Sequence, residues 1–125
     1  MSRRILVVED QEDNRRILRD LLTSAGYEII QAENGEEALA AAARERPDLI
    51  LMDIQLPGMD GLQATALLKA DAVTRDIPVI ALTALAMKGD EARIRAAGCD
   101  GYIGKPLAYR DFLATIAAHL VKASL

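Results

Sequence analysis

The stretch Ile5–Asp10 reads ILVVED, a continuous apolar run followed directly by two acidic residues. An apolar run without alternation is typical of a parallel strand that is covered on both faces. Residues 14–25 come next with apolar side chains at helical spacing, and Gly26 stands where such a helix would end. The stretch therefore predicts the first strand–helix unit of an α/β domain.

Four further units of this kind follow along the chain. Apolar runs begin at Tyr27, Leu49, Val79 and Gly101, and each is followed by a segment with helical periodicity. Strands that alternate with helices predict a parallel sheet with helices on both faces. We therefore expect an α/β, flavodoxin-like (βα)5 doubly wound fold, with a five-stranded parallel sheet in the order 2-1-3-4-5. We expect residues 1–125 to form one domain with no output domain.

The composition is that of an ordinary globular domain with a mild acidic excess. Hydrophobic residues make up 51% and charged residues 27%, and the formal net charge is -4. This charge disfavours a nucleic-acid partner, and no apolar stretch is long enough to cross a bilayer. Cys99 is the single cysteine, so an internal disulfide is excluded. A lone cysteine and a start without a signal-peptide pattern favour a cytoplasmic protein.

Polar residues that could perform chemistry stand at four of the five predicted strand ends. Glu9 and Asp10 follow the first strand, Asp53 ends the third, Thr83 ends the fourth, and Lys105 follows the fifth. Ligands of open α/β sheets bind beyond the carboxyl ends of the strands, and the order 2-1-3-4-5 makes the first and third strands neighbours. We therefore expect three carboxylates, a hydroxyl and an ammonium group in one pocket.

Three carboxylates in one pocket call for a compensating cation. Two carboxylates about 4 Å apart repel by roughly 4 kcal/mol at an effective dielectric constant near 20. Oxygen ligands suit Mg²⁺, with Mn²⁺ as a possible substitute, whereas Zn²⁺ prefers His or Cys. Asp53 stands alone at its strand end and is the candidate nucleophile for an aspartyl phosphate. The pair Glu9 and Asp10 is better suited to holding the cation.

Each of these residues has a simpler interpretation when it is taken singly. Acidic residues after a strand often cap the next helix, and a lone Asp before a loop is usually a turn residue. Thr83 could equally be a cap, and a Lys-Pro step is common in loops. The coincidence of all these residues at four strand ends of one sheet is what favours a functional site.

These residues make the chain similar to a known family, the receiver domain of two-component response regulators. The motifs that carry the resemblance are Ile5–Asp10, Leu51–Ile54 with Pro57 and Gly61 behind it, Leu82–Ala84, and Tyr102–Pro106. The stretch Asp53–Gly58 and the segment Thr83–Asp90 most resemble the DivK-type single-domain regulators.

The resemblance implies a role for each acidic residue of the site. Asp53 would be the phosphorylated aspartate. Glu9, Asp10 and Asp53 would bind Mg²⁺, with the backbone carbonyl of Gln55 as a further ligand. Glu9 stands where many relatives have Asp, a variation that leaves the metal role intact.

The resemblance also implies roles for the residues at the fourth and fifth strand ends. Thr83 and Lys105 would take part in catalysis by contacting the phosphoryl group. Thr83 and Tyr102 would move together as the switch, and Lys105–Pro106 would be a cis peptide. Gly104 departs from many relatives, which have Ser or a larger residue there, and this could loosen the loop that carries Lys105.

By the same resemblance, the phosphoryl donor would be a histidine kinase or a histidine phosphotransfer protein. The expected docking residues are Arg15, Ile17, Leu18, Pro106 and Leu107. Phosphorylation would change the surface of the fourth helix, the fifth strand and the last helix, and so control a downstream target protein or pass phosphate on in a phosphorelay. The chain would be a monomer or weak homodimer and a signalling protein, not an enzyme, although it would catalyse its own phosphorylation and dephosphorylation.

Three other functions fit the same architecture less well. A flavodoxin-like FMN protein needs a Ser-, Thr- or Gly-rich phosphate loop, whereas residues 9–13 carry four carboxylates that would repel a phosphate. A phosphatase of the haloacid dehalogenase type should have an Asp-x-Asp motif after an early strand and usually a cap domain. A phosphorylation-independent adaptor would have no need of the acidic residues, Thr83 and Lys105.

Overall fold

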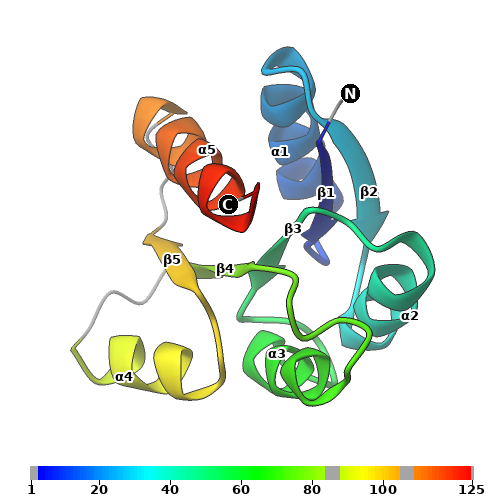
Figure 1. Cartoon of the computed structure of the whole chain (residues 1–125), viewed down its shortest axis with the longest axis vertical. Helices are drawn as coiled ribbons and strands as arrows, with labels where there is room; N and C mark the ends of the chain where they lie inside the picture. Colours follow the sequence, from blue (N-terminus) through cyan, green and yellow to red (C-terminus); the bar gives the residue numbers. More distant parts are fainter. Residues whose placement is uncertain (1–2, 84–87, 105–108, 125) are drawn as a thin grey trace.

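The computed structural model describes residues 3–83, 88–104 and 109–124. Strands and helices alternate along this chain, as expected (Figure 1). The elements are β1 (Arg4–Val8), α1 (Glu12–Ser24), β2 (Glu28–Ala32), α2 (Gly35–Glu45), β3 (Leu49–Asp53), α3 (Gly61–Ala70), β4 (Val79–Thr83), α4 (Lys88–Ala96), β5 (Gly101–Gly104) and α5 (Tyr109–Ser124).

The first helix is longer than the apolar pattern indicated. It begins at Glu12, two residues before the expected start at Asn14, and Glu12 and Asp13 form its acidic first turn. Negative side chains there interact favourably with the positive end of the helix dipole. The apolar periodicity could not reveal this turn, because both of its residues are polar and exposed.

The five strands form one parallel sheet in the order β2-β1-β3-β4-β5, which confirms the expected doubly wound fold. Val8 of β1 pairs with Met52 of β3, and Asp53 pairs with Leu82 of β4. The residue that follows Val8 is therefore carried to the side of Asp53. This register places the acidic residues of two neighbouring strands at the same end of the sheet.

Side chains alternate between two cores along each strand. Ile5 and Val7 of β1 pack with residues of α1 and α5, whereas Leu6 and Val8 pack with residues of α2, α3 and α4. Figure 1 shows α1 and α5 together on one side of the sheet and α2, α3 and α4 on the other. Each fully buried aliphatic side chain contributes about 2 kcal/mol. Burial on both faces explains why the strands are continuous apolar runs.

The loop between β3 and α3 is held close to the end of β3. The N–H of Gly61 donates to the carbonyl of Ile54 at 3.0 Å. Asp60 caps α3, because its side chain accepts from the N–H of Gln63 at 2.8 Å while the Gln63 side chain accepts from the Asp60 N–H at 3.0 Å. Such a reciprocal capping box satisfies two helix-end donors. The loop that follows Asp53 is thereby fixed at both ends.

Candidate phosphoacceptor site

The first part of the site is the end of β1. The Glu9 N–H donates to the carbonyl of Ala32 at 3.1 Å, which extends the β1–β2 ladder by one residue. The Glu9 carboxylate is buried and accepts a hydrogen bond from the Gln11 N–H at 3.3 Å. Asp10 follows directly and is exposed. One acid of the pair is therefore enclosed by the fold, and the other faces solvent.

The second part is Asp53, the last residue of β3. Its side chain is only 4% exposed, and Oδ1 accepts a hydrogen bond from the Gln55 N–H at 3.0 Å. The next residue, Ile54, donates its N–H to the carbonyl of Leu82 at 3.2 Å. The first bond orients the carboxylate from the following loop, and the second holds the backbone after Asp53 against β4. We expected the backbone carbonyl of Gln55 to be a metal ligand. In the structure the backbone of this residue contacts the Asp53 carboxylate through its N–H.

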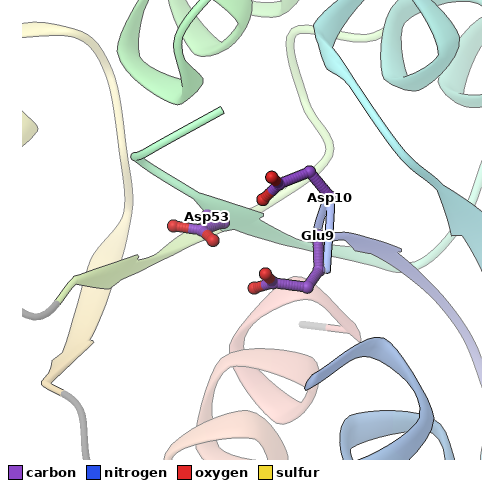
Figure 2. Close-up of side chains that lie close together, drawn as sticks. All are labelled: Glu9, Asp10 and Asp53. Atoms are coloured by element: carbon purple, nitrogen blue, oxygen red, sulfur yellow. The ribbon is translucent and has the colours of Figure 1, made fainter. Parts of the chain in front are cut away.

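The three carboxylates of Glu9, Asp10 and Asp53 come together as expected (Figure 2). One oxygen from each lies within 4.8 Å of the others. Such a group repels itself unless a cation offsets the charge. The donor set contains only oxygen atoms and is open to solvent at Asp10, which fits a hard divalent cation that keeps part of its water shell. The geometry therefore fits a magnesium site.

Thr83 ends β4, the strand beside β3, and Tyr102 lies on β5, the next strand of the sheet. Thr83 pairs with Gly104, and Ala81 pairs with Tyr102, so Thr83 and Tyr102 are diagonal neighbours on the same face of the sheet. Thr83 is buried, whereas Tyr102 is 36% exposed. The register thus allows the coupled movement expected of them. Lys105, Pro106 and Leu107 lie outside the described residues, and so do the roles expected of them.

The residues expected to dock a donor protein have different surroundings. Ile17 is 51% exposed and is available at the surface. Leu18 is only 3% exposed and packs in the core with α5, so its assignment as a docking residue was wrong. Consecutive helical residues point about 100° apart, so Ile17 can face solvent while Leu18 faces the core.

Arg15 has a contact that the sequence did not reveal. Its side chain is only 11% exposed and donates to the Glu9 carbonyl at 2.9 Å, so it offers little surface to a partner. The sequence signal was weak, because an arginine on an amphipathic helix is usually a surface residue. The position six residues after Glu9 is the only hint of a link to the site.

The fold and this site together define a class of protein. Residues 5–117 match the family model described as the response regulator receiver domain, and the chain belongs to that family. The polar-differentiation response regulator DivK of Brucella anthropi is 53% identical over 120 residues, which cover 96% of this chain and 98% of that protein. DivK of Brucella ovis is 52% identical with the same coverage. Within the family the chain is accordingly of the DivK type.

Solved structures show the same fold. The chemotaxis protein CheY4 of Vibrio cholerae has a TM-score of 0.89 at 28% identity, covering 94% of this chain and 98% of that one. The receiver domain of a sensor histidine kinase from Pseudomonas aeruginosa has a TM-score of 0.89 at 35% identity, covering 96% and 98%. That structure has a magnesium ion coordinated in its active-site cleft. In this chain, no helix of the described part has the length and apolar character to cross a membrane.

Proposed function

We propose that Asp53 accepts a phosphoryl group from a phosphohistidine donor in a magnesium-dependent reaction. The observation that carries the proposal is the approach of the Glu9, Asp10 and Asp53 carboxylate oxygens to within 4.8 Å of one another. Buried carboxylates are seldom gathered in this way unless a cation or a proton compensates them. The magnesium ion in the related Pseudomonas aeruginosa receiver supports the choice of metal.

Asp53 is held in a state suited to nucleophilic attack. The Gln55 N–H fixes one carboxylate oxygen at 3.0 Å and so orients the group. An Asp53 oxygen attacks the phosphorus atom, a P–O bond forms, and the P–N bond to the donor histidine breaks, which leaves an aspartyl phosphate and a neutral imidazole after protonation. Glu9 and Asp10, with the Gln55 carbonyl, would hold Mg²⁺ (or Mn²⁺), whose charge offsets that of the phosphoryl oxygens.

The phosphoryl group would act on the neighbouring strands. Phosphorylation adds about two negative charges and strong acceptor oxygens. The Thr83 hydroxyl would donate to them, Lys105 would pair with them, and Tyr102 would follow Thr83 on the same face of the sheet. The surface formed by α4, β5 and α5 would then shift between two arrangements and report the state.

The partners would be proteins. The donor would be a histidine kinase or a histidine phosphotransfer protein, and the output would be control of a downstream target or transfer of phosphate in a phosphorelay. In this proposal the chain is a stand-alone cytoplasmic receiver, a monomer or weak homodimer, whose only catalysis is its own phosphorylation and dephosphorylation. Neither nucleic acid nor membrane insertion is part of it.

Acetyl phosphate tests the proposal directly. Wild-type protein incubated with acetyl phosphate and Mg²⁺ should gain one phosphoryl group by intact-mass measurement, and excess EDTA should prevent the gain. Asp53→Asn should gain none, whereas Asp20→Asn, which changes an exposed carboxylate on α1, should behave as wild type. An equal gain in Asp53→Asn would assign the phosphoryl group elsewhere, and no gain in wild type would favour the phosphorylation-independent adaptor.

A further inference from the structure

Arg15 joins three segments of the chain through one guanidinium group. Its Nη1 donates to the Glu9 carbonyl at 2.9 Å, its Nε to Gln31 Oε1 at 3.2 Å, and its Nη2 to Glu33 Oε1 at 3.2 Å. Gln31 belongs to β2, and Glu33 follows that strand directly. The Arg15 side chain is only 11% exposed, and its hydrogen bonds attach α1 to the ends of β1 and β2.

One of these bonds holds the peptide unit that joins the two acidic residues at the end of β1, because the Glu9 carbonyl belongs to that unit and accepts from Arg15 Nη1. The preceding peptide unit is held as well, since its Glu9 N–H donates to the Ala32 carbonyl at 3.1 Å. Within the residues that the structure describes, the exposed Asp10 carboxylate forms no hydrogen bond or ion pair of its own. The direction in which Asp10 leaves the backbone therefore depends on the Glu9–Asp10 peptide, and Arg15 holds that peptide.

We propose that Arg15 is a positioning residue for the metal ligands Glu9 and Asp10. This inference rests on the proposed magnesium site and assigns part of its affinity to a side chain that touches neither the metal nor the phosphoryl group. Groups that orient metal ligands by hydrogen bonds, without contacting the metal, typically contribute 10–100-fold to metal affinity or activity. Because Arg15 acts through the backbone, we expect an effect at the lower end of this range.

The charge of Arg15 and its hydrogen bonds should have opposite effects on the magnesium affinity, which makes the proposal easy to test. A guanidinium close to the site repels a divalent cation, so removing its charge alone would strengthen magnesium binding. Removing its hydrogen bonds would loosen the peptide and weaken binding. Its ion pair with Glu33 leaves the sign of this comparison unchanged, because Glu33 is 63% exposed and such pairs are weak.

The test compares Arg15→Met and Arg15→Lys with wild type. Methionine keeps the apolar stem and loses all three donated bonds, whereas lysine keeps the stem and the charge but cannot reach three acceptors at once. The matched control is Arg16→Met, because Arg16 is 58% exposed and, among the described residues, its side chain bonds only Asp13. Magnesium affinity is measured by titrating Mg²⁺ while the amide NMR signals of Gln11 and Gln55 are followed, without any phosphoryl donor.

We expect Arg15→Met to bind Mg²⁺ about tenfold more weakly, Arg15→Lys to fall between it and wild type, and Arg16→Met to be unchanged. In acetyl phosphate reactions, Arg15→Met should need about tenfold more Mg²⁺ for half-maximal rate but should reach a maximal rate within about twofold of wild type. If Arg15→Met does not give a folded amide spectrum, Arg15→Lys decides the question by the same two measurements.

Unchanged or tighter magnesium binding in the folded Arg15 variants would overturn the proposal. So would a loss of maximal rate without any change in the magnesium requirement, which would indicate general distortion of the site. Failure of the proposed function looks different, because wild type itself would then bind no Mg²⁺ or gain no phosphoryl group. If wild type passes both tests and Arg15→Met equals it, only the role of Arg15 falls.

Discussion

Gly61 lies directly against the backbone of Asp53. A β-carbon at position 61 would overlap the Asp53 carbonyl oxygen and come within 2.8 Å of the Ile54 Cα. The neighbours are backbone atoms and cannot rotate away, so only glycine allows α3 to begin this close to the strand end. The backbone of the candidate phosphoacceptor is therefore packed from behind by the first residue of the next helix.

We expect Gly61→Ala to lower the free energy of unfolding by about 3 kcal/mol, because overpacking against backbone forces the loop to move. Urea denaturation measures this loss. Gly58→Ala is the matched control in the same loop, since its φ of 72° is unfavourable for alanine but nothing lies within 4 Å of the added carbon. It should lose only about 1 kcal/mol. An equal loss in both variants would show that backbone conformation, and not the contact with Asp53, sets the requirement for glycine.

Replacing Asp10 by Asn should have opposite effects on stability with and without magnesium. Without metal, Asp10→Asn removes one of three mutually repelling carboxylates and should stabilise the protein by up to about 1 kcal/mol, a modest gain because Asp10 is exposed. With Mg²⁺, wild type should gain stability with rising metal concentration and the variant should gain little. Thermal unfolding with EDTA and with millimolar Mg²⁺ checks both. A variant less stable than wild type in EDTA would contradict the repulsion argument.

Substitutions of the neighbours Ile17 and Leu18 should have different effects, one on docking of a donor protein and the other on stability. Leu18→Ala creates a cavity in the core beneath α1 and should cost about 3 kcal/mol of unfolding free energy. Ile17→Ala removes a side chain that is 51% exposed and should change stability by less than about 0.5 kcal/mol. If Ile17 contacts the donor protein, its variant should slow phosphoryl transfer from that protein while its reaction with acetyl phosphate stays normal. Equal stability losses would contradict the assignment of the two faces.

Cys99 should be a poorly reactive thiol in the folded protein. Burial raises the pKa of the Cys99 thiol, an effect that the nearby Asp100 carboxylate supports and that Thr65 and Lys69 oppose. The folded state therefore holds the thiol proton more tightly than the unfolded state, and this contribution to stability is present at neutral pH and lost as the pH rises above the ordinary thiol range. At about pH 8, iodoacetamide should react slowly with native protein and rapidly in urea. Rapid alkylation of native protein would show that the structure around Cys99 opens readily.

The sequence predicted the carboxylate group well because it depends on simple rules. Apolar runs end where strands end, and neighbouring parallel strands bring their carboxyl ends together, so Glu9, Asp10 and Asp53 had to meet once the strand order was known. Side-chain surroundings on helices were harder to predict. Leu18 and Arg15 both lie on α1, yet Leu18 packs in the core and Arg15 donates to the Glu9 carbonyl.

The sequence by itself determined the architecture, because continuous apolar strands joined by amphipathic helices have few ways to bury both faces of a sheet. It also determined which carboxylates could meet, since strand order and register follow from that architecture. Only the tertiary structure decided that Gly61 packs on the Asp53 backbone and that Arg15 turns inward to the Glu9–Asp10 peptide. No pattern along the chain indicates these contacts, because they form only when the loop, the helices and the strands are packed together.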